Sequence, residues 1–171
     1  MSSSIQINSN NIEAKELPHN IEAEQGLLGA ILINNDIIYD IQDIVNETHF
    51  YEPIHGLIFN IITNITSKGQ LASPVTLKSY FEAEKGLEQI GGSNYLARLA
   101  NSAVSLDFAK NYAQIIYDLS IRRGLFELGG KVQYEALETD INIGPNELIE
   151  NAEKQLYQIS EKGIGSGGVQ P

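Results

Sequence analysis

Three histidines are the first candidates for metal binding or acid–base chemistry in this sequence: His19, His49 and His55. Two ligands on one face of a helix need a spacing of about four residues, whereas His49 and His55 are six apart. Each histidine is therefore better explained as a structural or exposed residue than as a ligand. We expect neither a metal site nor a catalytic histidine.

Two pairs of acids, Glu22 with Glu24 and Glu82 with Glu84, are candidates for a general acid and its base. Residues two positions apart point to different sides of a helix, and the sequence implies no apolar pocket around either pair. We therefore expect both pairs to lie on solvated helix faces.

Composition and charge exclude further classes of function. The sequence has no cysteine, which excludes disulfides, thiolate nucleophiles and cysteine-bound zinc. It also lacks the G-x-x-x-x-G-K-[ST] loop that cradles the phosphates of ATP. With 22 acidic and 11 basic residues, the net charge is −11, which repels nucleic-acid phosphates. We predict no catalytic, cofactor-binding or metal-binding residue, no ATPase activity and no affinity for duplex DNA at physiological salt.

Apolar residues recur with helical spacing over most of the sequence, so we predict an all-α fold. The clearest helix begins near Pro53 and should stop at Gly69, and Asn20 and Ser73 are suited to cap two others. No apolar run approaches the roughly 18 residues that cross a bilayer, and the polar first residues do not resemble a secretion signal. We expect a soluble, cytoplasmic domain that does not contact membranes.

The last third of the sequence predicts a helical hairpin. A long helix over 107–137 is followed by a turn over 139–144 and by a second helix that starts at Pro145. We divide the chain into a flexible leader (1–16), a globular subdomain (17–104), the hairpin (105–162) and the start of a linker (163–171). The Gly-rich composition of 163–171 leads us to expect a longer parent protein.

Two apolar stripes run along the long helix, and a shorter partner helix can cover only one of them. The second stripe should pack on the hairpin of another subunit, because it would otherwise leave an exposed apolar patch. This predicted oligomer interface consists of Ile121, Leu125, Leu128 and Val132. The same helix carries three glycines, Gly124, Gly129 and Gly130. Either they bend the helix or they permit the close approach of a second hairpin, and the sequence leaves both open.

Four runs of residues carry a family resemblance. Residues 17–32 read Leu-Pro-His-Asn-Ile-Glu-Ala-Glu-Gln-Gly-Leu-Leu-Gly-Ala-Ile-Leu, which resembles the opening signature of DnaB-type replicative helicases. Residues 50–59, 73–77 and 91–96 resemble three further signatures of that family, in the same order and at similar spacing. The resemblance extends over residues 17–162 and is to the N-terminal domain of those proteins.

The resemblance implies a small orthogonal helical globule followed by a helical hairpin. Six such domains assemble in the family into a collar, a trimer of dimers, which in bacteria recruits the C-terminal domain of primase. The full-length parent would be an ATP-dependent helicase that unwinds duplex DNA. ATP, Mg and DNA would be bound by a RecA-like C-terminal domain, so this chain would reach DNA only through its parent.

The resemblance also suggests where primase docks, on a surface shared by the hairpin and the adjoining globule. Four residues satisfy that position and belong to types that are common in binding hot spots: Tyr117, Arg122, Arg123 and Tyr134. Ion pairs or ordinary hairpin packing are the alternative explanation for each.

Two alternatives to the collar domain are a free-standing helicase- or primase-binding adaptor without an ATPase domain, and a small acidic enzyme. A Walker A motif downstream of Pro171 would separate the collar from the adaptor.

Overall fold

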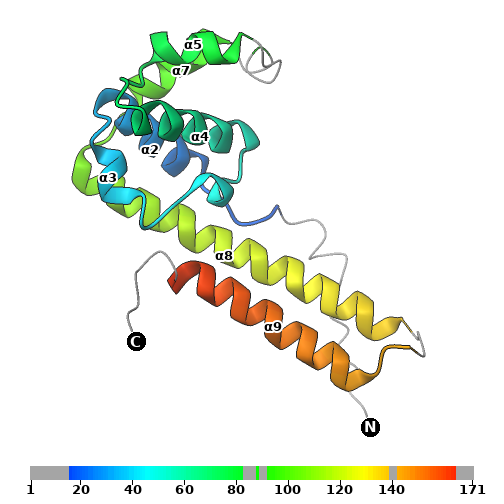
Figure 1. Ribbon diagram of the computed structural model, residues 1–171. Coiled ribbons are helices and arrows are strands. Elements are labelled where there is room, and N and C mark those ends of the chain that lie inside the picture. The colour runs from blue at the N-terminus through cyan, green and yellow to red at the C-terminus, as the bar shows by residue number, and fades with distance from the viewer. Residues whose placement is uncertain (1–15, 83–87, 89–91, 139–141, 165–171) are drawn as a thin grey trace.

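The computed structural model describes residues 16–82, 88, 92–138 and 142–164. These residues form helices and no strand, which confirms the predicted all-α fold. A globule occupies one end of the molecule, and a long two-helix hairpin projects from it (Figure 1). In chain order the elements are α2 (Ile21–Ile33), α3 (Ile37–Ile41), the 3-10 helix η1 (Glu47–His49), α4 (Pro53–Ser67), α5 (Pro74–Phe81), α7 (Ser93–Asn101), α8 (Leu106–Leu137) and α9 (Pro145–Ile164).

Local hydrogen bonds set several helix boundaries where the sequence predicts them. The side chain of Asn20 accepts the N–H of Ala23 at 2.9 Å and caps α2. Ser73 and Thr76 form a reciprocal capping box at the start of α5. Gly69 has a φ of 73°, a conformation that favours glycine, two residues after α4 ends. Residues 1–15 of the predicted leader lie outside the described residues. So do residues 165–171 of the predicted linker, whereas α9 extends to Ile164.

Helix α2 is the centre of the globule. Nine of its 13 residues are buried, so it has almost no solvent face. It packs against α3, α4 and α7 and against the first half of α8 (Figure 1). The last residue of α8 that joins this core is Ile116, and beyond the globule α8 packs on α9.

The crossing of α2 and α7 depends on Gly29. A Cβ atom at this position would lie 1.9 Å from the carbonyl oxygen of Leu99 and 3.0 Å from the amide nitrogen of Ala103. Both neighbours are backbone atoms, which cannot rotate away as a flexible side chain can. A glycine inside a helix costs about 1 kcal/mol relative to alanine, and the close crossing explains why this position accepts that cost.

We predict that Gly29→Ala destabilises the globule by about 3 kcal/mol or more, because the added methyl group forces two backbones apart. Chemical denaturation followed by circular dichroism would measure the loss. Gly129→Ala is the matched control, since a Cβ there meets nothing within 4 Å. The control should gain about 0.5–1 kcal/mol from helix propensity alone. Equal stability of the two variants would contradict this account of the crossing.

Candidate functional site

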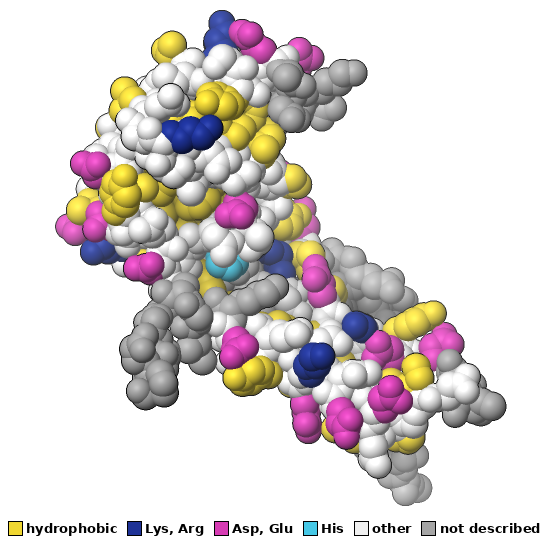
Figure 2. Space-filling view, viewed as in Figure 1, with side chains coloured by type: hydrophobic (Ala, Val, Ile, Leu, Met, Phe, Trp, Pro, Cys, Tyr) yellow, Lys and Arg dark blue, Asp and Glu magenta, His cyan; other side chains and the backbone are white. Residues whose placement is uncertain are grey.

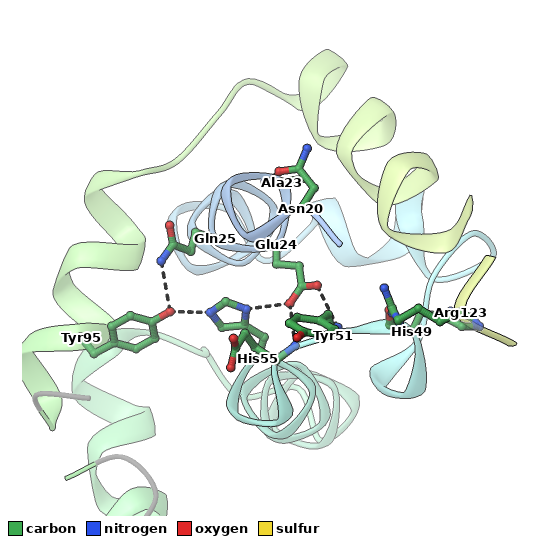
Figure 3. Close-up of polar contacts among 10 residues, drawn as sticks. Asn20, Ala23, Glu24, Gln25, His49, Tyr51, His55, Tyr95 and Arg123 are labelled. Atoms are coloured by element: carbon green, nitrogen blue, oxygen red, sulfur yellow. Dashed lines mark hydrogen bonds and ion pairs between the residues drawn. The ribbon is translucent and has the colours of Figure 1, made fainter. Parts of the chain in front are cut away.

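A buried polar network links three helices of the globule (Figure 3). Glu24 of α2 and His55 of α4 are each only 1% exposed. The His55 Nδ1 lies 2.8 Å from the Glu24 Oε1, and its Nε2 is hydrogen-bonded to the hydroxyl of Tyr95 on α7. Because a carboxylate can only accept, Nδ1 carries the proton and donates to Glu24. Gln25 completes the network by donating to the Tyr95 oxygen at 3.4 Å.

The Glu24 carboxylate also binds the backbone just before α4. Its Oε2 accepts the N–H of Tyr51 at 2.8 Å, and its Oε1 accepts the N–H of Glu52 at 3.2 Å. The side chain of Glu52, the N-cap residue of α4, makes no cap hydrogen bond. Glu24 therefore holds the backbone that leads into α4, and it does so from a different helix.

The order of acid, histidine and hydroxyl resembles a nucleophilic triad, but the environment gives it a structural role. Tyr95 is 9% exposed and the other two residues are almost fully buried, so their hydrogen bonds join α2, α4 and α7 inside the core. Burial raises the pKa of Tyr95, which keeps its hydroxyl protonated and able to donate. Among the described residues, no group of three or more His, Asp or Glu could hold a metal ion.

The expectation that Glu24 lies on a solvated face is wrong, whereas Glu22 is exposed as expected. The sequence contains a signal for the difference. Glu24 falls three, four and seven positions before Leu27, Leu28 and Ile31, and all three are fully buried. A carboxylate on the apolar face of a helix must find hydrogen-bond donors, and here they come from α4 and from the backbone just before it.

A second polar contact fixes the hairpin to the globule. Arg123 of α8 donates to the carbonyl oxygen of Pro18 at 2.8 Å and to that of His49 at 2.7 Å. Its guanidinium lies 5.5 Å from the ring centre of Tyr51, and that ring stacks on His19 with centres 4.1 Å apart. Partial burial lowers the pKa of Arg123, and the nearby Glu24 carboxylate opposes this effect. Within the chain, Arg123 thus binds backbone carbonyls, which differs from the ion pair considered from the sequence.

The other predicted docking residues occupy two separate places. Tyr117 packs edge-on against the His49 ring, with centres 5.2 Å apart, at the base of the hairpin. Arg122 is exposed and lines a shallow surface together with Tyr117 and Leu125. Tyr134 is 67% exposed and lies 17 residues after Tyr117 on α8, which is about 25 Å along the helix axis. The four candidates therefore do not form one surface.

The predicted oligomer stripe is only partly exposed. Leu125 and Val132 are 45% and 39% exposed, Ile121 is half-buried, and Leu128 is 7% exposed, which makes it part of the packing inside the hairpin.

Val132 lines an open groove of about 550 Å³ at the hairpin tip, with Leu148, Ile149 and Leu156 of α9 on the other side. Three of these four groove residues are at least 39% exposed, the exception being Leu148. The hairpin therefore presents an apolar surface, which we call the tip groove, that the described part of the chain leaves uncovered. Within that part, no helix is long and apolar enough to cross a membrane.

We predict that Glu24→Gln destabilises the globule by about 2–4 kcal/mol, because an amide cannot accept from His55 and two backbone N–H groups as a carboxylate does. Glu22→Gln removes the same charge from the same helix turn at an exposed site. This matched control should change stability by only about 0.5 kcal/mol. Urea denaturation of both variants gives the comparison, and similar midpoints would argue against the network.

Comparisons with known proteins agree with this fold. The family described as the DnaB-like helicase N-terminal domain matches residues 16–118. The replicative DNA helicase DnaB of Rickettsia felis is 38% identical over 166 residues, which are 92% of this chain and 34% of that protein. DnaB of Treponema pallidum is 26% identical over 149 residues, 87% of this chain and 34% of that protein. The chain thus spans about a third of the length of these relatives.

Two solved structures share the architecture. The N-terminal domain of DnaB helicase from Mycobacterium tuberculosis superposes with a TM-score of 0.76 at 26% identity, covering 84% of this chain and 99% of that one. A DnaB-like replicative helicase, described with its interactions with primase, gives a TM-score of 0.64 at 26% identity, covering 82% of this chain and 31% of that one. The match to the family over residues 16–118 and the similarity of the whole fold lead to one conclusion: this chain belongs to the DnaB-like helicase N-terminal domain family.

Proposed function

We propose that this chain is the N-terminal collar domain of a replicative DNA helicase, which assembles the helicase ring and docks primase. The observation that carries the proposal is a long hairpin that projects from a folded globule and leaves apolar side chains of both its helices uncovered. The relatives named replicative DNA helicase, of which the chain spans about a third, support the same function. Unwinding of duplex DNA with ATP and Mg would belong to the remaining two thirds of such a parent, acting in the cytoplasm.

Self-association is the first part of the proposed function. The uncovered apolar residues lie on both helices of the hairpin, Leu125 and Val132 on α8 and Ile149 and Leu156 on α9. A second hairpin that presents the same surface would cover them, as in a symmetric dimer. Leu128 contributes to this interface by supporting the hairpin from inside, since it is already buried.

Primase docking is the second part. One structural relative is described with its interactions with primase, which makes primase the partner to test first. We place its docking site at the base of the hairpin, where Tyr117 and Arg122 lie beside Leu125 and next to the globule. Arg123 would contribute indirectly, by holding the hairpin to the globule. Tyr134 would be too distant to belong to the same site. Figure 2 shows acidic side chains over the globule and the far part of the hairpin, which favours protein contacts over phosphate contacts.

We predict that the chain forms dimers or larger species at tens of micromolar and that Leu125→Asp shifts them toward monomer. A carboxylate at this position cannot be buried against a second apolar surface without a large desolvation cost. Light scattering measures the mass, and circular dichroism checks that the helices remain. Asn151→Asp is the matched control, since Asn151 is exposed and does not line the surface that contains Leu125. A strictly monomeric wild type at high concentration would overturn the assembly role.

We predict that Arg122→Ala weakens binding of the primase C-terminal domain by about 5- to 30-fold, the usual range for a residue worth 1–2 kcal/mol. Tyr134→Ala should leave the affinity unchanged, because Tyr134 lies at the other end of the hairpin. The titration compares proteins of matched oligomeric state, since primase would recognise the assembled ring. If only Tyr134→Ala lowers the affinity for primase, the docking site lies at the hairpin tip and not at its base. If the wild type does not bind primase at all, the docking role is wrong and only assembly remains.

A further inference from the structure

Helix α8 contains three glycines within seven residues, Gly124, Gly129 and Gly130, yet it is continuous from Leu106 to Leu137. Each glycine lowers the equilibrium constant for helix formation about five-fold relative to alanine. The helix is therefore weakest at this segment, although the structure shows no break there.

The fold itself does not require these glycines. A Cβ atom at Gly129 or Gly130 would meet no atom within 4 Å, and one at Gly124 would lie 3.7 Å from the Ile159 side chain, an ordinary contact. This distinguishes them from Gly29, where a Cβ would collide with the backbone of α7. Alanine would fit all three positions, so another property of glycine must be the reason for them.

The directions of the three positions argue against close approach of a single helix. At about 100° per residue, Gly129 points about 140° and Gly130 about 240° away from Gly124. A helix that packs against one of them cannot reach the other two. The property that all three share is the freedom of their backbone, which lowers the cost of bending.

The location of the segment gives bending a specific effect. Gly124 directly follows Arg123, which holds α8 to the globule through two backbone carbonyls. At the level of the glycines, the groove between α8 and α9 is lined largely by polar side chains, among them Lys131, Gln155 and Gln158. Leu128 and Ile159 are the two apolar side chains in this lining, and theirs are the apolar contacts that a change in the path of the two helices would rearrange.

We propose that residues 124–130 are a hinge that lets the hairpin tip move while the globule stays fixed. About 20 Å of α8 lies beyond Gly124, so a bend of about 20° would displace the tip by about 7 Å. The tip groove would then move together with the surface bound to it, and the buried network of the globule would stay unchanged. The hinge is a property of the single chain and does not depend on the proposed helicase or primase role.

Spin labels test the hinge directly, because the sequence has no cysteine that would take up label elsewhere. Lys110→Cys and Gln133→Cys place two labels on exposed positions of α8, about 35 Å apart in a straight helix. Dilution with unlabelled chain removes distances between copies. We expect a broad distance distribution with a tail toward shorter values, which narrows when Gly124, Gly129 and Gly130 are all replaced by alanine. Hydrogen-exchange protection of residues 125–134 should rise about five-fold for each glycine replaced.

Asn111→Ala is the control, since it raises helix propensity at an exposed position outside the segment. It should leave the distance distribution unchanged. A wild-type distribution as narrow as that of the triple-alanine variant would overturn the hinge. An unchanged width together with lost self-association would also overturn it, because the glycines would then serve close packing between copies.

Discussion

One buried carboxylate determines how the parts of this molecule are joined. A charged group in a core is tolerated when hydrogen bonds compensate for the loss of water, and Glu24 accepts three of them, from His55 and from the amides of Tyr51 and Glu52. These bonds fix where α4 begins and where the loop before it lies. The same loop supplies the carbonyl and the rings that Arg123 and Tyr117 of the hairpin contact. The attachment of the hairpin thus rests on a side chain that does not belong to it.

The sequence was sufficient for features that are decided locally. The caps at Asn20 and Ser73 and the stop at Gly69 depend on residues within one turn, so the helix boundaries followed from short patterns. Glu24 was misplaced because its partners lie in α4 and in the loop before it, 27 to 31 residues away. The interior position of Leu128 was likewise not predictable from the sequence, since the rotation of α9 about its axis decides which α8 residues it covers. The assignments of Ile121, Leu125 and Val132 to an interface, and of Tyr117 and Arg122 to docking, stay predictions.

The adjacent arginines show how one sequence motif divides into two roles. Arg122 and Arg123 differ by about 100° around the helix axis, which places one in solvent and the other against the globule. The guanidinium donates from two different nitrogens to carbonyls of two segments and lies over the Tyr51 ring, a geometry that the single ammonium of lysine would not reproduce. An acidic domain with so few cations therefore uses one of them to hold its own architecture. This is consistent with a domain whose surface serves protein assembly.

The contact made by Arg123 also has an evolutionary meaning, because its acceptors are main-chain atoms. Every residue type offers a carbonyl oxygen, so mutations at positions 18 and 49 can accumulate without removing the attachment. Arg123 has no such freedom, and neither has Glu24, which positions the loop that carries one of these carbonyls. We expect distant descendants of this domain to keep the angle between globule and hairpin after the residues at positions 18 and 49 have changed.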